Sequence, residues 1–333
     1  MAIGSGLSGQ FGVAKETTYG TYVAPTKFYE MESGGVNLDL IRVEGGGIAA
    51  GRAARLVSQS VIAGRGGTGT FVGSVPIVGF GLLLQQLFGT AVTPVQQGAT
   101  AAYLQTHALA ADLAGKSLTA QFGVPSTNGT VNPYTGLGGK ITKAGFSCAK
   151  DDMLKASIEF DFRDISEANP LAAATYNTNS APFNFMQLTV KAGTTVAGAT
   201  AVSGVTGISL DVERNQKTDR RYADGTGLKA EPITNDFVGA SGSIDADFVA
   251  KADLADRFAA NTTTALVFEF LGATIELTNK FALTFEMPAV KLTGATPQVG
   301  GPDVVSGGFP FTVYSNGTDP IVTAKYVTTD VTL

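Results

Sequence analysis

The sequence predicts a mainly β protein built from two similar halves. Its composition favours many short strands joined by glycine turns, because the chain has 42 glycines, no tryptophan and abundant threonine, valine and alanine. Residues 154–162 alternate between apolar and polar side chains, a pattern typical of a strand with one wet face. Residues 36–42 alternate mostly in the same way and predict a half-buried strand. A strand followed by a short helix also occurs twice along the chain.

The repeated unit begins at Gly69 in the first half and at Gly242 in the second. The first copy reads GTFVGS and leads into a predicted helix over residues 76–88; the second reads GSIDADF and leads into a predicted helix over 250–258. Leucine and phenylalanine lie four residues apart in both, which places them on one helix face, and a stop residue follows soon after. These positions are Leu84, Phe88 and Gly89 in the first copy and Leu254, Phe258 and Asn261 in the second.

The order strand, strand, long arginine-bearing loop, strand, helix, several strands appears in both halves. The long loops cover residues 44–67 and 214–238. Any all-β chain offers similar series, so a single unit with an inserted or appended β-domain is the structural alternative. Our predicted division is an N-terminal arm without its own core over 1–26, a first β unit over 27–165, a linker over 166–182 and a second β unit over 183–333.

The reactive side chains predict neither a catalytic site nor a cofactor or metal site. His107 is the only histidine, and its alanine-rich surroundings predict a surface position. Cys148 is the only cysteine, which excludes an intrachain disulfide, and its alternating strand predicts a small buried side chain. The triplet GKS at 115–117 lacks the earlier glycine of a phosphate-binding loop. Asp151 and Asp152 fit a hairpin turn better than an acid–base pair.

Charge and hydropathy exclude some partners and favour others. The net charge of −5 gives no overall basic footprint for nucleic acid or an anionic membrane. The N-terminus lacks the features of a signal peptide, and the most apolar run, 75–88, is too short to span a bilayer. Only 15% of the residues are charged, which suits a chain whose surface partly meets other subunits.

Two segments carry a resemblance to a known family: residues 11–21, FGVAKETTYGT, followed by Pro25-Thr26, and residues 139–162. The first resembles the opening, and the second the central hairpin, of the major tail proteins, or tail tube proteins, of long-tailed bacteriophages, especially phages of actinobacteria. The resemblance implies a tail-tube β-barrel or sandwich with a helix on its flank. Six units would make a ring, and stacked rings a tube that conducts DNA. Three copies of a duplicated chain, or six of a single-unit chain, would complete one ring.

The resemblance also implies a location and partners. The chain would belong to the virion tail, would assemble in the host cytoplasm without a membrane, and would meet the tape-measure protein, the tail terminator and baseplate proteins. DNA would pass without specific binding, so the lumen wall should lack lysine and arginine that hold phosphates. Candidate lumen-facing residues, which could equally lie on solvated outer faces, are Ser157, Glu159, Asp161, Asp245 and Asp247.

The two glycine-rich loops are the candidates for contacts between rings. Their arginines could pair with carboxylates of the next ring, although mobile, solvated loops are the alternative. The N-terminal arm, residues 1–26, and the last predicted strand, 321–333, could pair as added strands with the sheets of neighbouring subunits. The candidate inter-ring residues are Arg52, Arg55, Arg65, Arg220 and Arg221.

A receptor- or carbohydrate-binding β-module of a tail or cell surface is the alternative from a different functional class. Such a module would need an exposed aromatic cleft, and the absence of tryptophan counts against it. Polymerisation at high concentration would separate the two, because a binding module should remain a small oligomer.

Overall fold

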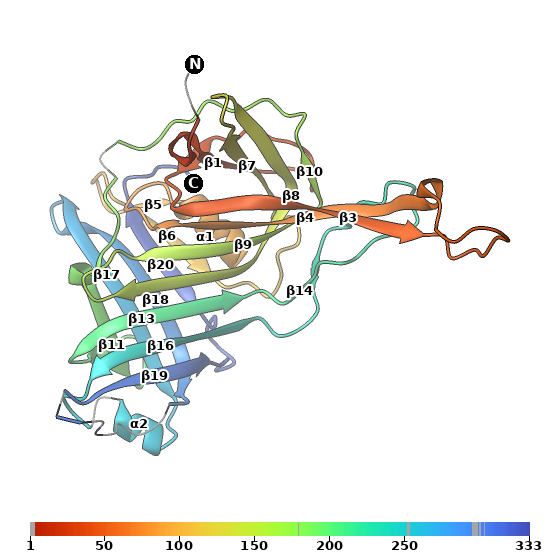
Figure 1. Ribbon diagram of the computed structural model, residues 1–333. Helices are drawn as coiled ribbons and strands as arrows, with labels where there is room; N and C mark the ends of the chain where they lie inside the picture. The colour runs from red at the N-terminus through yellow and green to blue at the C-terminus, as the bar shows by residue number, and fades with distance from the viewer. Residues whose placement is uncertain (1–3, 179, 252–253, 295–298, 300, 303) are drawn as a thin grey trace.

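The computed structural model describes residues 4–178, 180–251, 254–294, 299, 301–302 and 304–333. Within these residues it has twenty strands and two α-helices, so the prediction of a mainly β fold is confirmed (Figure 1). The elements of the first half are β1 (Gln10–Lys15), β2 (Lys27–Tyr29), β3 (Ser33–Glu44), β4 (Ser60–Ser74), α1 (Gly81–Phe88), β5 (Val95–Gln96), β6 (Tyr103–Ala108), β7 (Leu118–Pro125), β8 (Val131–Ala149), β9 (Lys155–Phe162) and β10 (Asp164–Ser166).

The second half follows a loop that runs from β10 to β11. Its elements are β11 (Leu188–Gly193), β12 (Thr200–Ala201), β13 (Val205–Glu213), β14 (Gln216–Lys217), β15 (Ile233–Thr234), β16 (Gly239–Asp247), α2 (Ala255–Ala259), β17 (Thr264–Glu276), β18 (Asn279–Leu292), β19 (Ser306–Val313) and β20 (Thr323–Thr328). Short 3-10 turns, Gly6–Ser8, Val57–Gln59 and Phe185–Gln187, complete the described elements.

One antiparallel sheet runs through both halves of the chain. Its strand order is β3–β4–β9–β8–β13–β16–β19. The two halves meet where β8 pairs with β13, from Lys143 opposite Glu213 to Ala149 opposite Gly207. Several of these strands lie side by side across Figure 1, with α1 behind them.

Each half repeats the same strand pairings. In the first half, β1 pairs with β2 and β7, β8 with β7, β9 and β10, and β4 with β3 and β9. In the second half, β11 pairs with β12 and β17, β18 with β17, β19 and β20, and β16 with β13 and β19. The order of elements that recurs in the sequence therefore recurs as a pattern of hydrogen-bonded strands.

The register of the repeat agrees with the alignment of Gly69 with Gly242. Thr70, after Gly69, lies opposite Gly35 of β3 and Glu159 of β9. Ser243, after Gly242, lies opposite Ser209 of β13 and Pro310 of β19. Positions in β3 and β13 can therefore be compared residue by residue.

The two halves differ in one insertion. Between α1 and β7 the first half carries β5 and β6, and β6 pairs with β20 of the second half. In the second half, α2 leads directly into β17 over described residues. The strand β6 therefore braces the junction between the halves, and the second half has no counterpart to it among the described residues.

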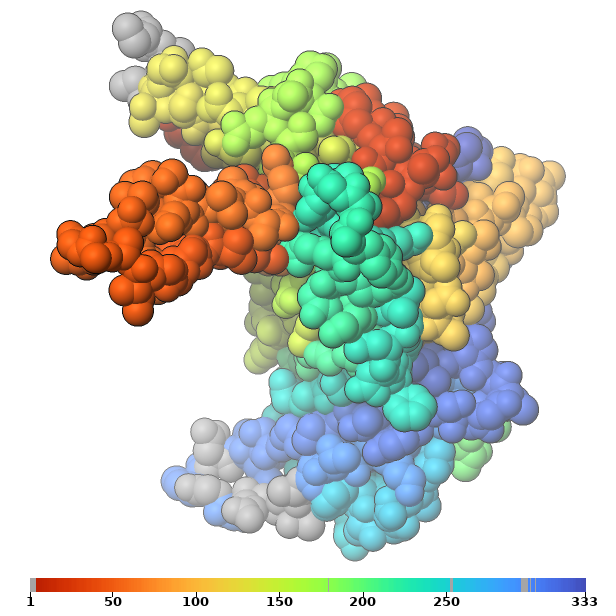
Figure 2. All heavy atoms as spheres, turned by 90° about the vertical axis from the view of Figure 1, so that its right-hand side faces the viewer, coloured from red at the N-terminus to blue at the C-terminus, as the bar shows by residue number. Residues whose placement is uncertain are grey.

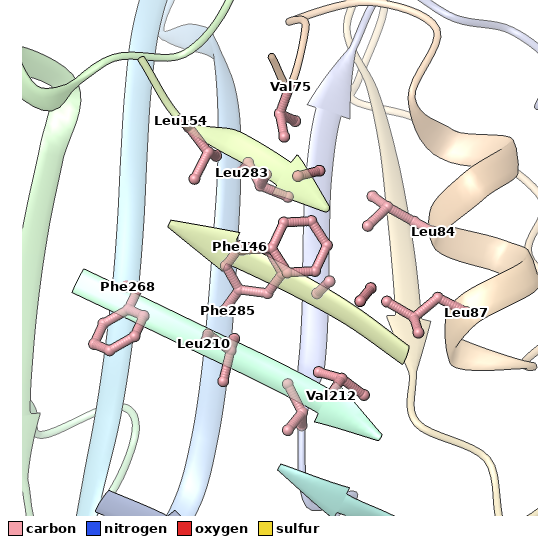
Figure 3. Close-up of a cluster of buried hydrophobic side chains, with 14 of the residues drawn as sticks. Val75, Leu84, Leu87, Phe146, Leu154, Leu210, Val212, Phe268, Leu283 and Phe285 are labelled. Carbon is pink, nitrogen blue, oxygen red and sulfur yellow. The ribbon is translucent and has the colours of Figure 1, made fainter. Parts of the chain in front are cut away.

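The hydrophobic core is continuous across the junction. Leu84 and Leu87 of α1 point toward Phe146 of β8 and toward Val212 of β13 (Figure 3). The ring centroids of Phe146 and Phe285, from β8 and β18, lie 4.8 Å apart. Every residue of α1 is buried, so this helix fills the space between the sheet and the strands behind it.

Both predicted helices are shorter than expected. The first begins at Gly81 rather than at 76, because Pro76 instead forms a bridge with Pro182. It ends at Gly89, whose φ of +83° and N–H bond to the Gln85 carbonyl terminate the helix as predicted. The second is Ala255–Ala259, and residues 252–253 of its predicted range lie outside the described residues.

The N-terminal segment differs from the expected arm. Residues 10–15 form β1, which lies between β2 and β7, and Phe11 and Val13 are fully buried. The Phe11 ring stacks on Phe71 with centroids 4.5 Å apart and packs against Phe122 at 4.7 Å. This strand belongs to the core of the first half because its aromatic side chain completes an aromatic cluster.

The first long loop is largely a hairpin. Residues 60–67, expected in a loop, belong to β4, and β3 extends to Glu44. The apolar–polar alternation at 36–42 predicted a half-buried strand, but β3 contains no buried residue, and Leu38, Ile41 and Val43 are exposed. The outer part of the hairpin projects beyond the sheet, and these three side chains remain 37–48% exposed in the single chain (Figure 1).

The repeated glycines provide a stability prediction. A methyl group at Gly69 would lie 2.6 Å from Cε2 of Phe162, and one at Gly242 would meet the Ser209 carbonyl oxygen. Gly69→Ala and Gly242→Ala should each lower the free energy of unfolding by about 1–3 kcal/mol, with the larger loss at Gly242, where backbone must move. Urea denaturation measures both. Gly239→Ala is the control, since a methyl group there meets nothing within 4 Å; equal effects at Gly239 and Gly242 would contradict the packing argument.

His107 is not at the surface as predicted. It is fully buried on β6, opposite Ala324, with its ring centroid 6.5 Å from that of Phe88. The alanine-rich stretch around it forms a strand braced by β20, which the composition did not reveal. Burial lowers the pKa of His107 from 6.5 to about 4. Cys148 is buried as predicted, and burial raises its pKa to about 11.

The lowered pKa of His107 predicts acid sensitivity. Between pH 6.5 and 4 the unfolded chain binds a proton at this ring that the folded chain does not, so acidification lowers the free energy of unfolding. A depression of the pKa from 6.5 to about 4 corresponds to roughly 3 kcal/mol of stability lost on full acidification. His107→Asn should remove this part of the pH dependence. The measurement is the free energy of unfolding of the variant and of the unaltered chain at a series of pH values. Parallel profiles over that range would contradict a neutral, buried imidazole.

Candidate assembly surfaces

The predicted lumen residues of the two halves lie on one face of the seven-stranded sheet, which we call the polar face. Directly opposite residues of antiparallel strands share a face. Ser157 lies opposite Gly145, which lies opposite Asp211, which lies opposite Ser241. Residues two apart on a strand share a face as well. The polar face therefore carries Ser157, Glu159, Asp245 and Asp247 together.

Small and acidic side chains dominate the polar face, and lysines on it have acidic neighbours. Lys143 Nζ lies 2.9 Å from Glu213 Oε1. Lys155 Nζ lies 3.5 Å from carboxylate oxygens of Glu32 and of Asp152. These contacts offset the positive charge that would otherwise attract phosphates.

Asp161 is on the same strand face but is not exposed. Its carboxylate lies 2.5 Å from Lys229 Nζ, and each side chain is only 7% exposed. Burial raises the pKa of Asp161 to about 6, although Lys229 and then Arg221 act in the opposite direction. The 214–238 segment that carries Lys229 covers this end of the polar face, so Asp161 does not contribute to its exposed part.

The hairpin of β3 and β4 forms a projection that we call the arm, residues 42–62. It contains Arg52 and Arg55, two of the predicted inter-ring arginines, and Arg55 pairs with Glu44 within the arm. The arm extends away from the body in both views (Figures 1 and 2). Its exposed apolar side chains are Val43, Ile48, Leu56, Val57, Val61 and Ile62.

The second long loop, 214–238, instead packs on its own chain at the base of the arm. Arg65 N–H donates to the Gly227 carbonyl at 3.0 Å, and Arg65 Nε donates to Asp164 at 2.8 Å. Arg221 Nη2 donates to the Arg65 carbonyl at 3.4 Å. Arg65 and Arg221 thus meet each other, far along the hairpin from Arg52 and Arg55.

Arg220 also bonds within the loop. Its Nη1 donates to the Glu231 carbonyl at 2.7 Å, and its guanidinium lies over the Tyr222 ring, 5.6 Å from the centroid. Glu231 in turn accepts from the buried Lys140 at 2.6 Å. The two loops lie on the same side of the molecule, the side that Figure 2 shows, with the arm in orange and the 214–238 segment in teal.

Two strand edges are open among the described residues of the single chain, one at β3 and one at β18, the strand that pairs with β19. Among the described residues, β3 pairs only with β4. The second open edge belongs to β18, which pairs with β17 up to Val290 and with β19 up to Leu292. Beyond Val290, no described strand lies on the side of β18 that faces β17. In the first half the corresponding side of β8 holds β13. One signal of the β3 edge is visible in the sequence, because this strand carries apolar side chains on both of its faces.

The described residues contain no helix that is both long and apolar enough to cross a membrane. A search of curated proteins found no match to the chain. A protein-family model described as "Phage tail tube protein" matches residues 6–313, nearly the whole chain. This match, together with the mainly β fold, bears out the resemblance seen in the sequence. The chain therefore belongs to the phage tail tube protein family, whose members are structural proteins of the virion tail.

Proposed function

We propose that three copies of this chain close into a ring, and that the rings stack into a tube through which DNA passes during ejection. In this proposal the chain has two tail-tube units, 27–165 and 183–333, joined by the linker 166–182, with β1 of the N-terminal segment added to the first unit. The repeated strand pairings support the duplication. A homohexamer of a single-unit chain is the alternative.

The junction between the halves is the observation that carries the proposal. Within the chain, the first half receives β13 beside β8. If the second half follows the same pattern, β3 of the next copy would pair with the open edge of β18, which begins after Val290. The unpaired edges of one copy would then be complementary to each other, and closure would remove edges that otherwise invite aggregation.

The strand count favours three copies over six. Each half would contribute four strands to a closed barrel, which gives about 24 strands for three chains. At roughly 4.8 Å per strand and a tilt near 45°, the backbone circle is about 50 Å across, and side chains reduce the bore to roughly 40 Å. Duplex DNA, about 20 Å thick, fits such a bore. Six chains would double the circle and leave a bore much wider than a duplex needs.

The polar face would line the lumen. Its small and acidic residues, including Ser157, Glu159, Asp245 and Asp247, would not hold phosphates, and the pairing of Lys143 with Glu213 supports the same conclusion. The conduit would then pass DNA without gripping it. Family membership supports the further partners: the tape-measure protein, the tail terminator and baseplate proteins, met in the host cytoplasm during assembly.

Electron microscopy of the concentrated, purified chain tests this proposal. End-on views should show hollow rings with threefold modulation on a sixfold outline, and native mass spectrometry should give three chains per ring. Strict sixfold rings of six chains would keep the tube and reject the duplication as the basis of ring closure. Persistent monomers or dimers at high concentration would reject the tube, and glycan binding would then be the function to test.

A further inference from the structure

We propose that Lys229 and Asp161 condense into an intramolecular amide, which ties the second half of the chain covalently to the first. Asp161 lies on β9 of the first half, and Lys229 lies on the 214–238 segment of the second. The newly folded chain carries the two residues as an ion pair, and the amide forms from that pair with time. The reaction needs only the single chain and does not depend on the proposed tube.

The two reacting groups are held in contact and away from water. Lys229 Nζ lies 2.5 Å from Asp161 Oδ1, and each side chain is only 7% exposed. A nitrogen at that distance from the oxygen lies roughly 3–3.5 Å from the carboxyl carbon, the separation from which an attack can begin. Groups fixed in this way can react as if present at an effective concentration of about 10⁵–10⁸ M. An amide bond that two solutes would form very slowly therefore becomes accessible here.

The lysine side chain occupies a space that a glycine leaves open. A methyl group at Gly66 would collide with Lys229 Cε, so only glycine at this position of β4 admits the side chain without displacing it. The next carbonyl group along β4, that of Gly67, accepts a hydrogen bond from Lys229 Nζ at 3.4 Å. The buried Ile165 packs against Gly67. Backbone and apolar atoms therefore hold the amine against Asp161.

Burial favours the neutral forms of both groups, which are the forms that react. Transfer of one proton from the ammonium group to the carboxylate removes two charges from a site of low exposure. Among the described residues, none donates a hydrogen bond to the buried Oδ2 atom of Asp161, so the charge of the carboxylate is incompletely stabilised. Burial is also the largest of the effects on the pKa of Asp161, which it raises to about 6 against the opposing effects of Lys229 and Arg221.

The reaction joins the two side chains and releases one water molecule. The lone pair of the neutral Lys229 nitrogen attacks the carboxyl carbon of Asp161 and forms the new N–C bond. One proton then moves from this nitrogen to the hydroxyl oxygen of the carboxyl group. The C–O bond breaks, and the oxygen leaves as water with the bonding pair. No atom is oxidised or reduced, so the product forms without a cofactor.

A second carboxylate lies near the pair and can carry the proton. Asp39 of β3 lies directly opposite Gly66, so its side chain is on the face of the sheet that Lys229 covers. The negative charge of Asp39 contributes to the raised pKa of Asp161, so the two carboxyl groups interact. Asp39 is exposed and exchanges protons with water. Asp39→Asn should therefore slow amide formation without changing its product.

Other lysine–carboxylate pairs at similar distances serve as internal controls. Lys140 Nζ lies 2.6 Å from Glu231, but the Glu231 side chain is 34% exposed. Lys325 Nζ lies 2.6 Å from Glu286, but the Lys325 side chain is 41% exposed. Contact with water stabilises the charged forms of these groups. Among the lysine–carboxylate pairs of the described residues, the proposed pair alone is buried on both sides, so the amide should form there and not at the other two.

The amide should also increase resistance to unfolding. A cross-link between residues far apart in the sequence restricts the unfolded chain more than the folded one. The unaltered chain should therefore unfold at a higher urea concentration after prolonged incubation than when freshly folded. Lys229→Arg retains a positive charge, but its guanidinium group stays protonated and does not attack the carboxyl carbon. This variant should show no such gain.

Mass spectrometry of the intact, unaltered chain tests the amide directly. After prolonged incubation near neutral pH, we expect the mass to fall by that of one water. Proteolysis should then release a branched peptide that joins Lys229 to Asp161, and no branched peptide that contains Lys140 or Lys325. An unchanged mass together with the absence of the branched peptide would overturn the proposal.

Three variants identify the reacting groups. Lys229→Arg should keep its full mass, and loss of water from this variant would overturn the assignment of the amine. Asp161→Asn should lose ammonia instead of water and reach the same final mass as the unaltered chain, because the product is the same amide. Lys217→Arg, which alters an exposed lysine on the same segment, is the matched control and should lose water as the unaltered chain does.

Discussion

Leu38→Asp should abolish ring closure while leaving the single chain folded. Leu38 of β3 corresponds to Val212 of β13. Gly35 lies opposite Thr70 and Ser209 lies opposite Ser243, and Leu38 and Val212 each follow these positions by three residues. Val212 is fully buried at the junction between the halves, whereas Leu38 is 39% exposed in the single chain. At the proposed junction between copies, Leu38 would occupy the buried environment that Val212 has.

Placing a carboxylate there should cost about 3 kcal/mol or more at each junction, equivalent to a loss of affinity of at least about 150-fold. Sedimentation velocity and end-on electron microscopy should report monomers at concentrations where the unaltered chain forms rings. The midpoint of thermal unfolding should change little, because the side chain is partly in water before assembly. Asn37→Asp is the matched control, since Asn37 lies on the polar face and is exposed. Rings formed by Leu38→Asp at the normal concentration would contradict the role of β3.

Lys229→Met should destabilise the chain by about 3–5 kcal/mol, because removal of one partner leaves a buried charge unpaired. The Asp161 carboxylate would lose the ammonium group at 2.5 Å while the surrounding atoms still exclude water. The segment 214–238 should then detach from the base of the arm, since Lys229 also donates to the Gly67 carbonyl at 3.4 Å. Urea unfolding measures the loss, and hydrogen exchange of the segment measures the detachment.

The pH dependence provides a second readout of this pair. Burial raises the pKa of Asp161 to about 6 even beside Lys229, and removal of Lys229 takes away an interaction that lowers this pKa. In Lys229→Met the carboxyl group must either stay charged without a partner or bind a proton, and both cost more free energy at pH 8 than at pH 5. The loss in Lys229→Met should therefore be larger at pH 8. Lys217→Met, which removes an exposed pair with Asp219 on the same segment, should cost less than about 0.5 kcal/mol. Adding Asp161→Leu to Lys229→Met should recover most of the stability; no recovery would contradict the unpaired-charge argument.

Local regularities carried most of what could be predicted about the fold. The two-residue period of 154–162 predicted β9, because alternation is a property of neighbouring residues. The alignment of Gly69 with Gly242 predicted a repeated order of elements. The structure places the two glycines at corresponding register positions, where an added methyl group would collide with a neighbouring atom. The helix stop at Gly89 was predicted from the residue type, because glycine readily adopts the left-handed φ that ends a helix, and its φ is +83°.

Contacts between distant segments could not be predicted from the same patterns. His107 is buried because β20, more than 200 residues later, pairs with its strand. Asp161 is covered because Lys229 reaches it from the second long loop. The alternation in β3 predicted a half-buried strand, whereas Leu38, Ile41 and Val43 are exposed in the single chain. Each of these errors concerns a partner that no local pattern specifies.

The strand β6 has a consequence for the kinetics of ring formation. It braces the junction within the chain, and the second half has no counterpart for the junction between chains among the described residues. In the proposed ring, half of the lateral junctions would therefore form during folding, at the high effective concentration of segments on one polypeptide. A ring would then need three junctions between separate chains instead of six. The two halves would also be free to diverge, so that one carries the arm while the other folds its loop against the body.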